Sequence, residues 1–191
     1  MVDLYIGKGP AQARILCLDE MGPVAAKTYL CYRWTGLRRP PRDADYGRRG
    51  KVWVFGALEP ATGRALTHCY RFRDSNSWVD FLERVRKHWP HDALFLIQDN
   101  LSTHRTADVL LSSSRFPEVE FVFLPTYAPY LNLIEPWWKI LTSLALKGRR
   151  FNSADEIVDA VADGIAYWNR QRHPFLWRKI QWARPIYRKA I

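Results

Sequence analysis

The chain has 191 residues, which is enough for one domain with a substantial core and too few for two large domains. Its hydrophobic fraction of 48% excludes an intrinsically disordered chain, and it contains neither a run of about 18 apolar residues nor a signal-peptide pattern. Lys and Arg outnumber Asp and Glu by 29 to 19, and the resulting charge of +10 favours a polyanionic partner such as nucleic acid.

The three cysteines form no C-x-x-C pair, which argues against both a disulfide framework and a zinc site. We therefore expect a soluble, cytoplasmic protein with no membrane partner. Residues 1–191 are predicted to form a single domain with a lead segment at 1–13 and a basic tail at 170–191. A basic protein without any polyanionic partner is the alternative interpretation of the charge.

The first half of the chain is rich in strand patterns. Residues 14–18 form an apolar run that predicts a buried strand, which should end at Asp19, Glu20 and a Gly-Pro turn. Residues 28–32 are a second, weaker strand candidate. Residues 51–58 and 65–72 flank a short Pro- and Gly-containing connection, which predicts a β-hairpin.

A helix is predicted after this hairpin. Several N-cap residues at 74–77 precede large apolar residues at helical spacing, and Pro90 ends the pattern. Residues 93–97 are continuously apolar, as in a parallel strand that is buried on both faces. A second helix is expected at about 102–112.

The last third of the chain begins with a predicted buried strand at 119–124. After a loop, Glu135 and Pro136 open a helix that should end at Gly148. The S-x-x-E pattern of Ser153 and Glu156 is a capping box that opens a final amphipathic helix.

This order of elements predicts an α/β fold. Three strands without intervening helices favour an antiparallel start, and strands joined through helices favour a parallel remainder. The expected architecture is a mixed five-stranded sheet with helices on both faces.

Three carboxylates occupy matching places in this scheme. Asp19 and Asp99 each follow a predicted strand, and Glu135 opens the helix after the last strand. Because such positions meet at one edge of an open sheet, the three acids are expected to converge. Clustered acids require a cation, and oxygen ligands favour Mg²⁺ or Mn²⁺, with two ions suited to phosphodiester chemistry.

Each acid also has a simpler interpretation. Asp19 could be an ordinary loop residue, and Asp99 could form an Asx-turn beside Asn100. Glu135 could stabilise a helix start together with Asn132.

Three blocks of sequence surround the three acids: LCLDEMGP at 16–23, IQDNLSTH at 97–104 and LPTYAPYLNLIE at 124–135. These blocks resemble the signature blocks of DDE transposases, and most closely those of the bacterial insertion-sequence branch of the mariner superfamily. The resemblance extends from about residue 4 to residue 169. It implies a ribonuclease H-like fold and a Mg²⁺-dependent DNA-cleaving and strand-joining activity, in which Asp19, Asp99 and Glu135 would be the metal ligands.

The resemblance implies further roles. Asp19 would bridge two ions, Asp99 would complete one and Glu135 the other. Asn100 and His104 would contact phosphate or order the loop of the second acid, although a turn and a helix start also explain them. We expect Trp137 and Trp138 to pack in the core rather than stack on bases.

Double-stranded DNA is the partner that the family implies, with transposon ends and target DNA as substrates. Basic residues that could contact DNA lie in a loop at 38–49 and around the Glu135 helix: Arg38, Arg39, Arg42, Arg48, Arg49, Lys51, Lys139, Lys147, Arg149 and Arg150. Full-length members carry amino-terminal helix-turn-helix domains, for which the position of Asp19 leaves no room. We therefore expect sequence-specific recognition of transposon ends to be absent or supplied in trans by a separate DNA-binding chain. The resemblance also implies a homodimer on DNA, because the family pairs two transposon ends.

Two other functions stay open from the sequence. One is a catalytically inactive DNA-binding or dimerisation module derived from a transposase. The other is a related ribonuclease H-like nuclease that acts on RNA–DNA hybrids or branched DNA.

Overall fold

The central strand of the protein is hydrogen-bonded along both of its edges. A computed structural model describes residues 13–29, 45–90, 93–99, 117–125 and 129–175. The sheet has the order β3-β2-β1-β4-β5, in which β1 pairs antiparallel with β2 and parallel with β4. The predicted mixed sheet of five strands is therefore confirmed. Its strands are β1 (Ala13–Ala25), β2 (Lys51–Leu58), β3 (Ala65–Tyr70), β4 (Ala93–Gln98) and β5 (Val119–Phe123).

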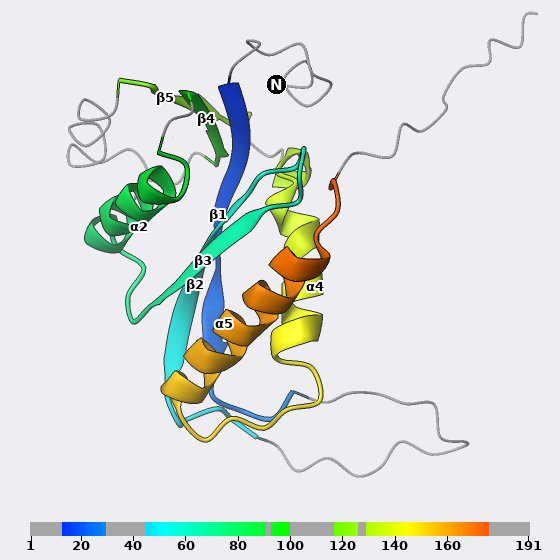
Figure 1. Ribbon diagram of the computed structural model, residues 1–191. Coiled ribbons are helices and arrows are strands. Elements are labelled where there is room, and N and C mark those ends of the chain that lie inside the picture. The colour runs from blue at the N-terminus through cyan, green and yellow to red at the C-terminus, as the bar shows by residue number, and fades with distance from the viewer. Residues whose placement is uncertain (1–12, 30–44, 91–92, 100–116, 126–128, 176–191) are drawn as a thin grey trace, which may run out of the picture.

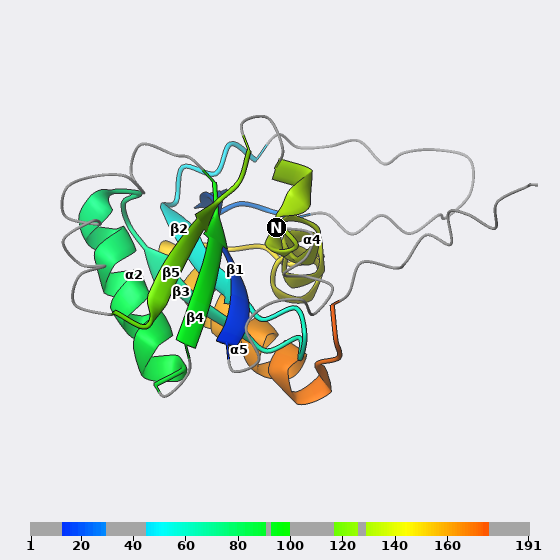
Figure 2. The same cartoon turned by 90° about the horizontal axis from the view of Figure 1, so that it is seen from above.

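Helices cover both faces of this sheet, as the sequence predicted. Figures 1 and 2 show α2 (Ser75–His88) on one face, with α4 (Ile134–Ala145) and α5 (Ala154–Gln171) side by side on the other. A 3-10 turn, η2 (Pro129–Leu131), leads into α4. No helix within the described residues is both long enough and apolar enough to cross a membrane.

The α2 face is closed by aromatic packing. Asp74 caps α2, because its carboxylate accepts a hydrogen bond from the Ser77 backbone N–H at 2.8 Å. The apolar stripe of the helix then buries Trp78 and Phe81 against Phe55 of β2, with ring centroids 5.6 and 5.9 Å away. The predicted helix and its cap region are confirmed.

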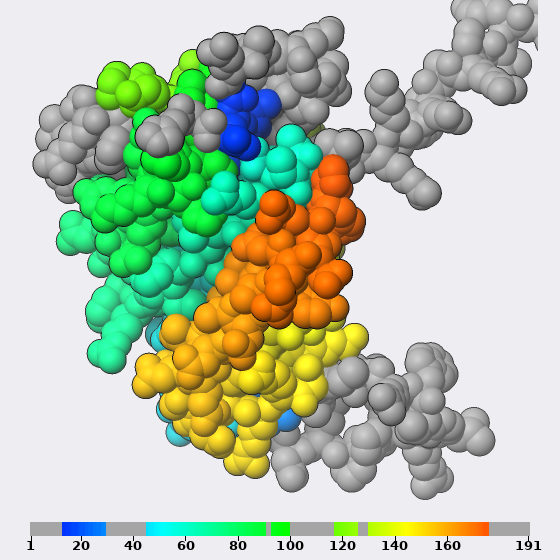
Figure 3. Space-filling model, in the orientation of Figure 1, coloured from blue at the N-terminus to red at the C-terminus, as the bar shows by residue number. Residues whose placement is uncertain are grey.

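The α4–α5 face holds a second apolar cluster. The predicted N-cap of α5 is present, since the Ser153 hydroxyl accepts from the Glu156 backbone N–H at 3.2 Å, while the Glu156 carboxylate accepts from the Asn152 backbone N–H at 2.8 Å instead of closing the box on Ser153. Trp137 of α4 and Trp168 of α5 pack edge to face, with centroids 6.1 Å apart. Figure 3 shows α5 (orange) lying along this face beside the end of α4 (yellow). The buried face of α4 is therefore held between the sheet and α5.

The first strand is longer than the sequence predicted. It does not end before Asp19 but continues to Ala25, so that Asp19 lies inside β1 and pairs with Gly56 of β2. The Gly-Pro pair forms an irregularity between Met21 and Val24, after which pairing with β2 resumes. A bulge, rather than a chain-reversing turn, explains why the prediction stopped too early.

Other predicted elements have mixed outcomes. The candidate strand at 28–32 is reduced, in the described residues, to an isolated bridge between Thr28 and Arg150. The strand predicted at 119–124 exists as β5, but it is an edge strand with half-buried side chains and an exposed Glu120. The helix predicted at 102–112 and the last part of the basic tail lie outside the described residues.

The segment before α4 is attached to β1 by one buried amide. Asn132 is 2% exposed, and its Nδ2 donates a hydrogen bond to the Leu18 carbonyl at 2.9 Å. Its own carbonyl accepts from the Glu135 backbone N–H at 3.1 Å. This residue therefore connects the start of α4 to the central strand.

Replacing Asn132 by Ala should lower the free energy of unfolding by about 1–3 kcal/mol, because a buried hydrogen bond between two distant segments is lost. Urea denaturation measures this effect. Asn76→Ala, at an exposed position of α2, is the matched control and should change stability by less than about 0.5 kcal/mol. Equal stabilities of the two variants would contradict this role of Asn132.

Candidate active site

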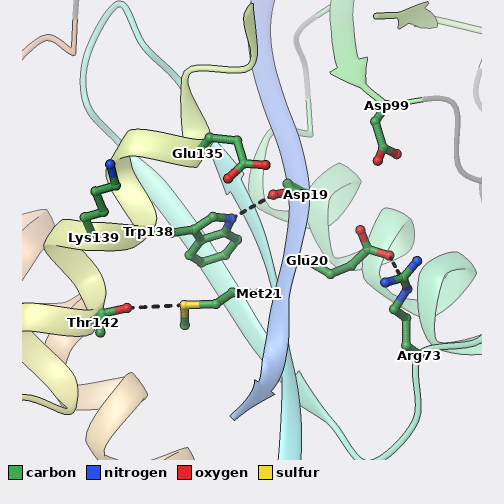
Figure 4. Close-up of a pocket in the computed structure, with 9 residues that line it drawn as sticks. All are labelled: Asp19, Glu20, Met21, Arg73, Asp99, Glu135, Trp138, Lys139 and Thr142. Carbon is green, nitrogen blue, oxygen red and sulfur yellow. Dashed lines mark hydrogen bonds and ion pairs between the residues drawn. The ribbon is translucent and has the colours of Figure 1, made fainter. Parts of the chain in front are cut away.

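The three acids singled out in the sequence line one pocket. The pocket has a volume of about 620 Å³ and opens between β1, the end of β4 and α4. Figure 4 shows the carboxyl groups of Asp19 and Glu135 turned toward each other, with Asp99 on the opposite side of the pocket. Its lining residues are Asp19, Glu20, Met21, Arg73, Asp99, Glu135, Trp138, Lys139 and Thr142.

Sheet topology explains how these acids meet. The parallel pairing of β1 with β4 ends at Cys17 and Ile97, so Asp19 and Asp99 each lie just beyond the paired stretch. Glu135 lies in the first turn of α4, which crosses the same end of the sheet. Strand ends and helix starts at one sheet edge are the usual place for ligand sites in open α/β sheets.

Side chains of α4 and its lead-in contact β1 at three successive points. In addition to the bond from Asn132 to Leu18, Trp138 Nε1 donates to Asp19 Oδ2 at 2.9 Å. The Thr142 hydroxyl lies 3.4 Å from Met21 Sδ. The helix that carries Glu135 is therefore held in register with the strand that carries Asp19.

The electrostatics of the pocket favour proton or cation binding. Burial raises the pKa of Asp19 to about 7, the nearby Glu135 carboxylate adds to this rise, and the Trp138 hydrogen bond opposes it. Burial also raises the pKa of Glu135, with a further contribution from the charge of Asp99 and an opposing one from Lys139. Like charges that face each other in a half-buried site would be stabilised by a cation.

A fourth carboxylate in the pocket already has a cationic partner. The side chain of Glu20 is 2% exposed, and its Oε1 lies 3.4 Å from Arg73 Nε. The Arg73 guanidinium also lies over the Trp53 ring, 5.3 Å from its centroid. Glu20 and Arg73 therefore form the wall of the pocket opposite α4.

The donor set of the pocket is suited to Mg²⁺. Among the described residues, no three His, Cys, Asp or Glu side chains are close enough to hold one ion together. Mg²⁺ is usually held by only one or two carboxylates, with water and substrate phosphate oxygens completing its shell. A pocket with Asp19 near Glu135, and Asp99 across from them, fits such an ion.

Sequence reasoning did not single out Glu20, Met21, Arg73 or Thr142 as pocket residues, and it missed a second role of Trp138. Arg73 and Thr142 had no recognisable local signal. Trp138 was expected in the core, where it lies at 6% exposure, but its indole N–H also contacts Asp19. Its position one helical turn after Glu135, on the same helix face, was the available signal. Asn100 and His104 lie outside the described residues.

The predicted DNA-contacting residues are distributed over two regions. Lys139 is exposed at the rim of the pocket, one turn after Glu135. The others in the described residues surround the bridge between Thr28 and Arg150, and these are Arg48, Arg49, Lys51, Lys147, Arg149 and Arg150. Arg49 is engaged within the fold, since it contacts Asp45 at 2.6 Å and the Phe151 carbonyl at 2.9 Å. Arg38, Arg39 and Arg42 lie outside the described residues.

A family model and a curated relative each match two thirds or more of the chain. The family model described as "DDE superfamily endonuclease" matches residues 14–158. A curated relative from Shigella sonnei, the "Insertion element IS630 uncharacterized 39 kDa protein", is 22% identical over 129 residues. That match covers 67% of this chain and 38% of the relative, so the chain spans less than half of the relative's length.

Structural comparisons identify the fold. The Mos1 transposase in its paired-end complex with the left transposon end has a TM-score of 0.62 at 15% identity, covering 91% of this chain and 53% of that chain. The HTLV-2 integrase catalytic core domain in complex with magnesium has a TM-score of 0.54 at 9% identity, covering 84% and 89%. The mixed sheet is therefore of the ribonuclease H-like kind found in transposase and integrase cores.

The raised pKa of Asp19 predicts a pH dependence of stability in metal-free protein. Between the ordinary value of 3.8 and about 7, the folded state keeps a proton that the unfolded state has released. The stabilisation from this proton is complete below pH 3.8 and is lost as the pH rises through about 7. Relative to Asp19→Asn, which cannot titrate, the free energy of unfolding of the wild type should fall across this window. Denaturant unfolding of both proteins at a series of pH values measures this difference. If the free energies of unfolding of wild type and Asp19→Asn change with pH in the same way, the prediction is wrong.

Proposed function

Because the chain belongs to the DDE superfamily endonucleases, we propose that it catalyses metal-dependent cleavage and strand transfer of DNA phosphodiesters. The observation that carries this proposal is the convergence of Asp19, Asp99 and Glu135, from three separate elements, in one pocket of a strongly basic chain. Transposon ends and target DNA are the substrates that this activity would use.

The three acids are the proposed metal ligands. Asp19, which Figure 4 shows between Glu135 and Asp99, would be shared by two ions, with Asp99 completing one site and Glu135 the other. Mg²⁺ or Mn²⁺ bound there would neutralise charge on the attacking and leaving oxygens during an in-line displacement.

The protein's own residues would orient the phosphodiester. Lys139 is exposed beside the acids, and its charge suits it to hold a phosphate next to Glu135. In the first step water would attack phosphorus and the P–O3′ bond would break, which leaves a 3′-hydroxyl. In the second step that hydroxyl would attack a target phosphodiester, so that one P–O bond forms as another breaks. The contribution of the fold is to hold these groups in register.

A cluster of cations away from the pocket supports double-stranded DNA as the partner. Backbone hydrogen bonds join residues 148–151 to residues 27–29, including Gly148 N–H to the Tyr29 carbonyl at 2.6 Å, and we call this junction the seam. Four exposed cationic residues surround this seam, namely Arg48, Lys51, Lys147 and Arg150. Since α4 rises about 1.5 Å per residue, the seam lies roughly 18 Å along the helix from Glu135, within reach of one DNA duplex. A homodimer on DNA is a further part of the proposal.

Replacing Asp99 by Asn or Glu135 by Gln should lower the rate of Mg²⁺-dependent nicking of DNA by at least about 100-fold, since even groups that only support metal ligands are often worth 10–100-fold. The assay uses supercoiled plasmid and oligonucleotides with element ends, with an RNA–DNA hybrid as the competing substrate. Glu120→Gln, at an exposed carboxylate of β5, is the matched control and should leave the rate unchanged.

Two outcomes of this assay would contradict the proposal. Wild-type protein that binds DNA but never cleaves it would favour the inactive DNA-binding module. Preferential cleavage of the hybrid would favour a ribonuclease H-like nuclease.

Replacing Lys147 and Arg150 together by Gln should weaken DNA binding and reduce the slope of log K against log salt by about 2, because each phosphate contact contributes roughly 0.9. Fluorescence anisotropy with a labelled duplex at several salt concentrations measures the slope. The charge-matched control replaces both Arg170 and Arg172 by Gln. These two residues are exposed at the carboxyl end of α5. If the two double variants have equal slopes, the residues around the seam do not contact DNA.

A further inference from the structure

The indole of Trp138 lies beside Asp19 and Glu135 in the pocket (Figure 4). Trp138 follows Glu135 by one helical turn, so both side chains leave α4 on the same face. The ring is 6% exposed, and its Nε1 donates to Asp19 Oδ2 at 2.9 Å. One helix therefore carries Glu135 and also holds one oxygen of Asp19.

A glycine opposite Asp19 provides the space for this ring. Gly56 of β2 is the cross-strand partner of Asp19. A Cβ atom at Gly56 would overlap Cη2 of Trp138 and would lie 2.9 Å from its Cζ2 and 3.1 Å from Ile134 Cδ1. The backbone of Gly56 is not in the left-handed region, so conformation does not require glycine at this place. Glycine weakens a strand interior, and close approach of another group is the usual reason for its presence there.

The need to pair a buried indole N–H does not by itself account for the bond to Asp19. The adjacent Trp137 is fully buried as well, and within the described residues its Nε1 has no hydrogen-bond partner. The fold thus tolerates an unpaired indole one residue away. The difference between the two tryptophans is the carboxylate that only Trp138 contacts.

We propose that Trp138, seated on Gly56, is a positioning residue that fixes the orientation of the Asp19 carboxylate for metal binding. With Oδ2 held by the indole, and with the Glu20 backbone N–H also donating to this carboxylate, the group keeps one orientation toward the pocket. A hydrogen bond from a neutral donor orients a metal-binding carboxylate without competing for its charge as a cation would. This inference rests on the proposed function, because it assigns Trp138 a role toward the same acids.

The test compares Trp138→Phe with Trp137→Phe in the full chain. Both changes remove an indole N–H and shrink a buried ring, but only the first removes the bond to Asp19. Mn²⁺ affinity, measured by isothermal titration calorimetry, should fall about 10–100-fold in Trp138→Phe and change little in Trp137→Phe. Gly56→Ala, which displaces the ring and keeps the indole, should weaken Mn²⁺ binding in the same direction.

A measurement on the wild type keeps the inference testable if these variants fail to fold. Titration with Mg²⁺ should shift the indole N–H resonance of Trp138 in nitrogen–proton correlation spectra and leave that of Trp137 in place.

The possible failures can be distinguished. Wild-type protein that binds no Mn²⁺ in the calorimeter would overturn the proposed function. A wild type whose Mn²⁺ binding is lost in Asp99→Asn, together with equal affinities in Trp138→Phe and Trp137→Phe, would overturn the role of Trp138 alone. Equal responses of the two indole resonances to Mg²⁺ would do the same.

Discussion

The attachment of α4 to β1 is the constraint on which the rest of the site depends. Asn132 holds the Leu18 carbonyl, Trp138 holds Asp19, and Thr142 lies against Met21, so that the helix runs beside the strand in a fixed register. The central strand is itself fixed by hydrogen bonds to both neighbours. Glu135 and Asp19 are therefore positioned by rigid elements rather than by flexible loops, and α5 holds α4 in place from outside.

This attachment maintains an arrangement of charges that is unfavourable without a cation. Burial raises the pKa values of Asp19 and Glu135, and the charge of Glu135 adds to the first rise as that of Asp99 adds to the second, so the pocket opposes ionisation of its own acids. Arg73 balances the charge of the fourth carboxylate, the buried side chain of Glu20. A fold that keeps such a pocket gives up some stability, which is typical of functional sites. The positive charge of the chain would attract the polyanionic substrate of the proposed activity.

Local patterns in the sequence were sufficient for most of the fold. Helical spacing with the Asp74 cap predicted α2, the Ser153 capping box predicted α5, and the apolar run at 93–97 predicted a buried parallel strand. The convergence of the acids followed from where strands end in an open sheet. The continuation of β1 through the Gly-Pro bulge could not be predicted, because pairing with β2 more than 25 residues away overrides the local turn signal. The bond between Trp138 and Asp19 joins residues that are distant in sequence. Two features of the sequence pointed to this bond: Trp138 follows Glu135 by one helical turn, and a glycine lies inside β2.

The central claim is that Asp19, Asp99 and Glu135 bind metal ions together. A crystal structure of the protein in Mn²⁺, with anomalous difference maps collected at the manganese edge, tests it most directly. The account predicts anomalous peaks in this pocket, with the Asp19 carboxylate as a ligand and its Oδ2 still bonded to Trp138. Absence of any peak in the pocket at saturating Mn²⁺, or a peak that Asp19 does not contact, would contradict it.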